Sequence, residues 1–224
     1  MDFEATNELP ISSPNRVTNL ASSLKTDVGE VQDKNLVIKV NKEIINTPRK
    51  ENESDEDYKR RRVEASIVFI KNHLERSRET KSVLNEKIIA PEEHHFIALA
   101  DDGYPAPFRV QEKISGEKLV NINLRELGRE QKRDLGSLIE SSIECYRKYG
   151  RFMDLVGLIE GKTQAILPEL KRHISPLKNS ENIFVTGDGR IALIDIESLN
   201  SSPIRNVVKF LSFTFHYWKN LRLS

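Results

Sequence analysis

The chain has 224 residues, 38% hydrophobic and 31% charged, which suffices for one sizeable globular domain or two small ones and excludes fibrous and low-complexity classes. Lys and Arg number 35 and Asp and Glu 34, so a net charge of +1 gives no whole-chain field that would favour nucleic acid or an anionic membrane. The single cysteine, Cys145, excludes an internal disulfide and a cysteine-rich zinc module. No long apolar run or signal peptide is present in the sequence, and we expect a cytoplasmic protein.

The first half of the chain predicts a β-rich segment followed by a helix. Residues 1–16 are polar and contain two prolines, which is typical of a disordered arm. Short β-type segments follow, and the clearest strand covers 35–40. A helix is expected next, with Ser54 as its N-cap and one apolar face formed by Val63, Ile67, Ile70 and Leu74.

Two hairpins and a long helix are expected in the middle and later parts of the chain. The first hairpin pairs 95–99 with 108–114 around an Asp-Asp-Gly-Tyr-Pro turn. The second pairs 182–185 with 191–195 around an Asp-Gly turn. An amphipathic helix over 130–148 lies between them, with inward residues Leu135, Leu138, Ile139, Ile143 and Tyr146, and Gly150 as its stop.

Two further helical segments are predicted. One covers 162–173, and the other begins near Pro203 and carries aromatic and basic side chains without a single acidic one. Packing within the domain explains the aromatic residues of this tail with fewest assumptions, and contact with a membrane surface or a partner is the alternative.

The order of these elements resembles the protein-kinase-like fold in its compact bacterial form, related to aminoglycoside and choline phosphotransferases. The residues that carry the resemblance are Val37-Ile38-Lys39-Val40, Asn182-Ile183-Phe184-Val185 and the segment 191–197. The resemblance implies an α+β fold with two lobes. A small antiparallel-sheet N-lobe with its hinge would cover 17–116, and a shortened, mainly helical C-lobe would cover 117–224.

The same resemblance implies a phosphotransferase that holds Mg²⁺ and ATP in the cleft between its lobes. In this chemistry a lysine binds the α and β phosphates and is oriented by a helix carboxylate, while asparagine and aspartate oxygens bind the metal ion. Lys39 and Glu64 are the expected lysine and carboxylate, with Glu56 and Glu75 left open as alternatives. Asn182 and Asp195 are the expected metal ligands, because antiparallel pairing would return both to one edge of their hairpin.

Two further contacts with the nucleotide follow from the resemblance. The main chain of the hinge, at Glu112 and Ile114, would hold the adenine. The phosphate-covering loop, 20–29, departs from the family pattern because it contains one glycine, so Ser22 and Ser23 are expected to supply hydroxyl and NH donors instead.

The position of the catalytic base decides between two functions. The family places an aspartate five positions before the metal-binding asparagine, and that position is Leu177 here. Asp154 follows the long helix directly and would serve as the base if 158–181 were an insertion. With Asp154 as base, the protein is a kinase-like enzyme acting on a small molecule or a specialised protein partner. Without it, the protein is a catalytically inactive pseudokinase that serves as a nucleotide-binding or protein-interaction module.

Overall fold

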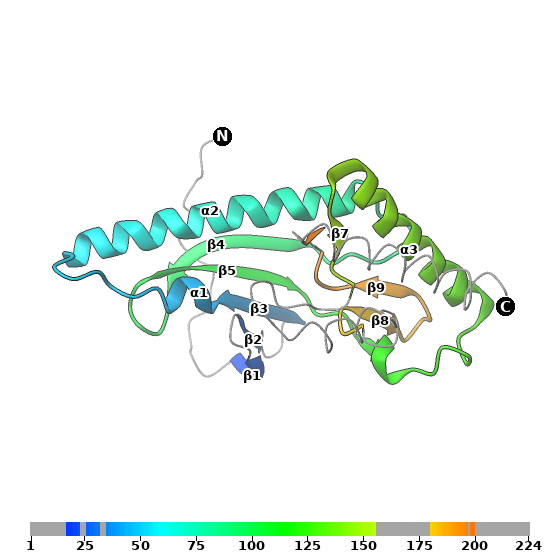
Figure 1. Cartoon of the computed structure of the whole chain (residues 1–224). Helices are drawn as coiled ribbons and strands as arrows, with labels where there is room; N and C mark the ends of the chain where they lie inside the picture. The colour runs from blue at the N-terminus through cyan, green and yellow to red at the C-terminus, as the bar shows by residue number, and fades with distance from the viewer. Residues whose placement is uncertain (1–16, 23–25, 32–34, 156–179, 197, 200–224) are drawn as a thin grey trace, which may run out of the picture. The chain divides into compact units, whose positions relative to one another are not determined.

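The computed structural model describes residues 17–22, 26–31, 35–155, 180–196 and 198–199. Within these ranges the chain forms two compact units with a mixed α+β composition and small antiparallel sheets (Figure 1). The first unit contains the described residues up to Ile67 together with Glu93–Lys113, and the second contains Val68–Glu92 and the described residues from Ile114 onward. No helix in these ranges combines the length and the apolar character needed to cross a bilayer.

Several predicted segments lie outside the described residues. They are the arm at 1–16, the helix at 162–173 and the tail from 203 onward. The first unit ends at Lys113, between Glu112 and Ile114, the two residues expected to hold the adenine. In addition, the segment Val68–Glu92 groups with the second unit, although the predicted N-lobe, 17–116, includes it.

The first unit is built on a five-stranded antiparallel sheet with the strand order β1-β2-β3-β5-β4. The strand at 35–40 and the hairpin that follows the helix are confirmed, although β4 and β5 begin two and three residues earlier than predicted. Gly103 adopts a left-handed φ of 77° in the turn between them. The strands are β1 (Val17–Ser22), β2 (Thr26–Val31), β3 (Leu36–Asn41), β4 (Glu93–Leu99) and β5 (Pro105–Glu112).

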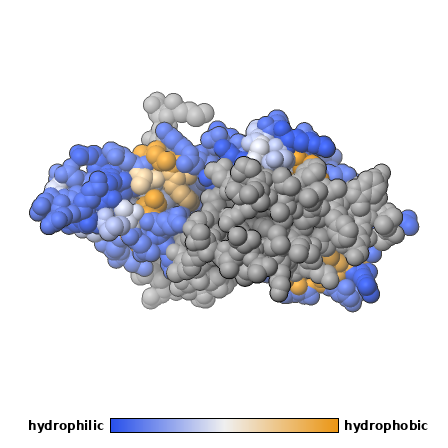
Figure 2. Space-filling view, viewed as in Figure 1, coloured by the Kyte–Doolittle hydropathy of each residue, from blue (hydrophilic) through white to orange (hydrophobic). Residues whose placement is uncertain are grey.

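The two faces of this sheet differ in polarity. Lys39 on β3 lies opposite Arg109 on β5, which lies opposite His95 on β4, so these three residues share one face. The other face carries the half-buried apolar residues Ile38, Val40, Phe96, Phe108 and Val110. The rings of Phe96 and Phe108 stack with their centroids 5.6 Å apart. Most of the coloured surface in Figure 2 is hydrophilic, and apolar residues gather in a patch over the region of β4 and β5.

The short helix α1 (Lys42–Ile45) and the long helix α2 (Asp55–Lys81) follow β3. The predicted cap of α2 is confirmed, because the Ser54 hydroxyl accepts a hydrogen bond of 3.1 Å from the Asp57 amide. The predicted apolar face is wrong in part. Ile70 is buried as expected, whereas Ile67 is 37% exposed, and the buried side is mainly polar, comprising Tyr58, Arg62, Ser66, Ile70, His73, Ser77 and Thr80.

Arg62 shows why a polar side chain can occupy the buried side of α2. Arg62 is only 1% exposed. Its Nη1 donates to the Asp102 carboxylate at 2.8 Å and to the Ile45 carbonyl at 3.0 Å. Its Nε donates to the Pro105 carbonyl at 2.9 Å. A buried guanidinium is tolerated when it is paired and hydrogen-bonded, and two of these partners lie about forty residues away in the sequence. The hydrophobic periodicity of a helix contains no information about hydrogen-bond partners so far along the sequence.

The second unit packs two small sheets with a helix. Its three-stranded sheet has the order β6-β8-β9, and a two-stranded ladder pairs β7 with β10. The elements are β6 (Gly116–Lys118), η2 (Leu119–Asn121), α3 (Arg129–Tyr149), β7 (Phe152–Met153), β8 (Ile183–Thr186), β9 (Ile191–Leu193) and β10 (Ser198–Leu199).

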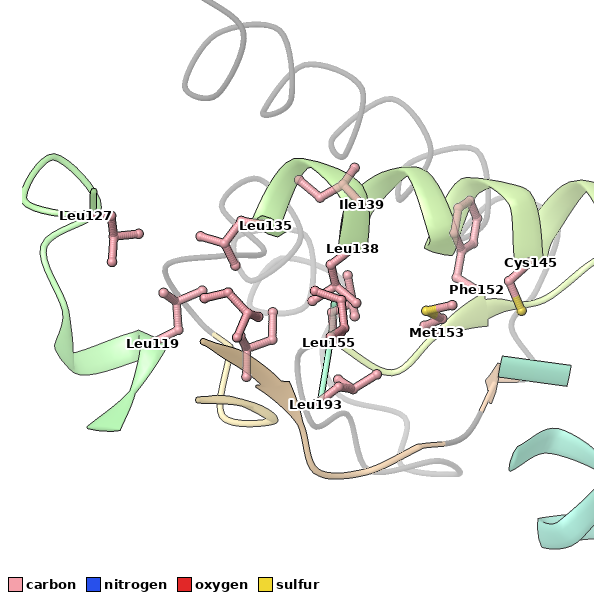
Figure 3. Packing of buried hydrophobic residues seen from close by; sticks show 13 residues of the cluster. Leu119, Leu127, Leu135, Leu138, Ile139, Cys145, Phe152, Met153, Leu155 and Leu193 are labelled. Carbon is pink, nitrogen blue, oxygen red and sulfur yellow. The ribbon is translucent and has the colours of Figure 1, made fainter. Parts of the chain in front are cut away.

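The core of the second unit lies along α3, as the sequence predicted. Leu135, Leu138 and Ile139 are fully buried, and the half-buried Ile143 and Tyr146 pack against the same cluster. Figure 3 shows these leucines beside side chains of η2, β7 and β9. Gly150 ends α3 with a φ of 71° and donates its NH to the carbonyl of Tyr146 at 2.8 Å, so the predicted helix stop is confirmed.

Candidate functional site

Two of the predicted site residues meet in the second unit through a buried hydrogen bond. The Asn182 side-chain Nδ2 donates to the main-chain carbonyl of Asp154 at 2.9 Å, across 28 positions of sequence. Each residue is 4% exposed. The Asp154 carbonyl is thereby satisfied inside the unit, and the segment that follows β7 is attached to the start of β8.

Asp195 lies at the edge where Asn182 lies. β8 and β9 pair in the register Ile183 with Leu193, and the Ile194 amide donates to the Asn182 carbonyl at 2.9 Å. The residue before Asp195 is therefore paired with Asn182 itself. The predicted hairpin is confirmed, and its turn contains Gly189 at a φ of 82°.

The segments that carry Asp154 and Asp195 are also joined by a strand pair. Met153 on β7 lies opposite Ser198 on β10, so the residue before Asp154 pairs with a residue shortly after Asp195. The buried Ser180 hydroxyl donates to the carbonyl of Leu155. Three sequence-distant stretches thus converge around the two aspartates.

The atoms available at this edge suit a hard divalent cation. A carbonyl oxygen can pair only with a donor, so the contact with Asp154 uses the Asn182 NH₂ group and leaves Oδ1 as the atom able to bind a cation. Asp195 is half-buried and supplies a carboxylate. An amide oxygen and a carboxylate are ligands that Mg²⁺ accepts together with water and phosphate oxygens.

The predicted lysine and its carboxylate belong to the first unit and have different surroundings. Lys39 is 8% exposed on β3, whereas Glu64 is exposed on α2, as are the alternatives Glu56 and Glu75. The structure therefore gives no support to the pairing of Lys39 with Glu64, which stays a prediction.

A carboxylate that the sequence reasoning missed lies on the sheet face of Lys39. Glu93 on β4 is opposite Gln111 on β5, two residues from the Arg109 that opposes Lys39. Its side chain is 2% exposed and forms an ion pair with Arg109 at 3.3 Å. No sequence signal distinguishes Glu93 from its neighbours, because the face it occupies depends on the register of three strands.

Three of the remaining predicted positions, Glu112, Ile114 and Ser22, lie in the first unit or directly next to it in the chain. Glu112 is the last residue of β5 and lies opposite Leu36, and Ile114 is the first residue past that unit. Ser22 ends β1 opposite Asp27. Ser23 and Leu177 lie outside the described residues.

Comparisons with known proteins give distant structural similarity only. No protein-family model matches the chain, and no curated protein matches it significantly. A crystal structure of WbdD aligns with 89% of this chain at 18% identity and a TM-score of 0.41, and the apo structure of the pseudokinase GRMZM2G135359 aligns with 89% at 9% identity and a TM-score of 0.38. The chain spans 37% of the WbdD chain and 64% of the pseudokinase chain. At these TM-scores the similarity to both structures is distant and carries no functional assignment.

Proposed function

We propose that this chain is a kinase-like, ATP-dependent phosphotransferase that uses Mg²⁺ and acts on a hydroxyl group of a small molecule or of a specialised protein partner. The observation that supports the proposal most strongly is the convergence of Asp154, Asn182 and Asp195 through the Asn182–Asp154 hydrogen bond and the β8–β9 register. In this proposal Asn182 Oδ1 and the Asp195 carboxylate hold the metal ion, which neutralises negative charge on the nucleotide phosphates.

Asp154 is the proposed general base. Its carboxylate accepts the proton of the acceptor hydroxyl while the acceptor oxygen bonds to the γ-phosphorus. The bond between the γ-phosphorus and the β,γ-bridging oxygen breaks, and ADP leaves. The hydrogen bond from Asn182 to the Asp154 carbonyl fixes the main chain of the base without occupying its carboxylate.

The first test is thermal unfolding of the full chain with ATP, with and without Mg²⁺. Ligand at about one hundred times its dissociation constant stabilises by roughly 2.7 kcal/mol, or about 5–10 °C for a chain of this size. We expect a Mg²⁺-dependent rise in Tm that is lost in Asp195→Ala. Asp188→Asn is the matched control, because Asp188 is exposed in the turn of the same hairpin. No rise in wild-type Tm at millimolar ATP would refute the proposal.

The burial of Asp154 favours a second candidate function. A general base must reach the acceptor, yet this residue is 4% exposed. The alternative is therefore a pseudokinase that binds nucleotide without transferring phosphate. Asp154→Asn separates the two functions, since an enzyme loses about 10²–10⁴ in the rate of ADP release while ATP affinity persists. A basal ADP-release rate unchanged by Asp154→Asn would favour the pseudokinase.

The carboxylate that orients Lys39 can be tested with two matched substitutions. Glu93 shares the sheet face of Lys39, whereas Glu64 is exposed. If Glu93 orients the lysine, Glu93→Gln will weaken ATP binding measured by titration calorimetry, and Glu64→Gln will leave it unchanged. The reverse pattern would establish the Lys39–Glu64 pair predicted from the sequence.

A further inference from the structure

One carboxylate on α2 is hydrogen-bonded to two separate segments of the second unit. Glu79 accepts from Arg151 Nη1 at 3.1 Å on each of its two oxygens, and its Oε2 also accepts from the Ser198 hydroxyl at 2.7 Å. The Glu79 side chain is 12% exposed and that of Arg151 is 29% exposed. Glu79 lies in the last turn of α2, where the helix dipole disfavours a negative charge. Helix formation therefore does not explain a carboxylate at this position. The contacts of Glu79 with Arg151 and Ser198 explain it.

The two segments that Glu79 joins are those that carry the proposed site aspartates. Arg151 stands three residues before Asp154, and Ser198 stands three residues after Asp195. The strands β7 and β10 pair and so join the two segments, but each strand has only two residues. A ladder this short is marginal by itself, so the spacing of the two segments depends on the groups that tether them. Glu79 is such a tether, because it bonds to both.

We propose that Glu79 and Arg151 are positioning residues that hold the segment of Asp195 in place relative to Asp154 and the Asn182 side chain bonded to it, and so set the spacing of the two metal ligands Asn182 and Asp195 for binding of Mg²⁺ with nucleotide; this inference rests on the proposed function. Mg²⁺ requires nearly octahedral geometry, so a displaced carboxylate costs affinity even when every ligand is present. Groups that hold metal ligands in place typically contribute about 10–100-fold to metal affinity or activity. The sequence carries no sign of this arrangement, because Glu79 and Arg151 are separated by 72 positions.

The experiment measures ATP affinity of the full chain by titration calorimetry, with and without Mg²⁺, alongside Tm. Glu79→Gln keeps the size of the side chain and removes its charge. We expect it to weaken Mg²⁺-dependent ATP binding about tenfold or more while leaving Mg²⁺-free ATP binding unchanged. Glu144→Gln is the matched control, since Glu144 forms an exposed ion pair with Arg147 on α3 at 3.8 Å, and we expect no change in affinity.

Two further variants keep the inference testable whatever Glu79→Gln does to folding. Arg151→Lys retains the positive charge that pairs with Glu79 but replaces the planar guanidinium with an ammonium, so it should show a smaller loss with the same Mg²⁺ dependence. In an Asp195→Ala background, Glu79→Gln should cause no additional loss, because its effect passes through the aspartate.

The outcomes separate this inference from the proposed function. Wild-type protein without Mg²⁺-dependent ATP binding would overturn the proposed function and the inference with it. Normal wild-type binding, with variants at Glu79 and Arg151 that bind Mg²⁺ and ATP as wild type does, would overturn the inference alone. The inference would also be overturned if the loss of ATP affinity were equal with and without Mg²⁺, or if Tm fell without a change in affinity. Either result would show that the ion pair between Glu79 and Arg151 only stabilises the fold.

Discussion

The hydrogen bond from Asn182 to Asp154 should contribute measurably to stability, independently of any ligand. Asn182→Ala removes the side-chain amide that donates to the buried Asp154 carbonyl. Removing a hydrogen-bond partner from a buried polar group costs about 1–3 kcal/mol. For a chain of this length each kcal/mol lowers Tm by about 2–4 °C, so we expect a fall of about 2–12 °C. Urea unfolding followed by circular dichroism measures the free energy, and a thermal scan measures Tm.

Two companion variants isolate the cause of that loss. Asn182→Asp keeps the size of the side chain but replaces the donor with an acceptor facing the Asp154 carbonyl, so it should destabilise at least as much as the alanine variant. Asn123→Ala removes an exposed amide that donates to Glu126 at 2.8 Å, and its effect should stay within about 0.5 kcal/mol. An Asn182→Asp protein as stable as wild type would refute the reasoning.

Three further predictions concern other parts of the chain. Burial raises the pKa of the Cys145 thiol to about 12, so thiol reagents at pH 8 should label the native protein far more slowly than the urea-unfolded chain, and rapid native labelling would contradict this. The Arg61 guanidinium lowers the pKa of Glu53 from 4.5 to about 2; the stabilisation is present above pH 4.5 and lost as pH falls toward 2. Wild-type Tm should therefore fall more steeply over that range than the Tm of Glu53→Gln, and parallel curves would show that the pair does not contribute. A Cβ at Gly116 would lie 2.4 Å from a main-chain oxygen of β8, so Gly116→Ala should lower the urea midpoint of unfolding. Gly187→Ala is the control and should not lower it, because a Cβ there meets open space. Equal midpoints for the two variants would show that β6 and β8 can move apart freely at Gly116.

Elements with local patterns were predictable from the sequence. The inward face of α3 follows from the spacing of Leu135, Leu138 and Ile139, because hydrophobic periodicity reports a helix face directly when the buried residues are apolar. The β8–β9 hairpin follows from its Asp-Gly turn between two apolar stretches. Its antiparallel register alone returns Asn182 and Asp195 to one edge, so this part of the candidate site could also be predicted.

The buried side of α2 could not be predicted in the same way. Arg62 is buried because Asp102 and the Pro105 carbonyl pair with it from the β4–β5 hairpin. A hydropathy pattern assigns such a side chain to the surface, since it contains no information about partners far along the chain. The same limit applies to Glu93, whose position on the face of Lys39 depends on two strand registers.

By itself, the sequence predicted the helices α2 and α3 and the two hairpins β4–β5 and β8–β9, and it suggested residue types suited to binding a metal ion and transferring a phosphoryl group. Tertiary structure alone decided which of these residues meet. The attachment of Asp154 to Asn182 spans 28 positions, and the contacts of Glu79 with Arg151 and Ser198 span 72 and 119. Hydrogen bonds and ion pairs across such separations leave no periodic trace in the sequence, because their geometry arises only when strands and helices pack.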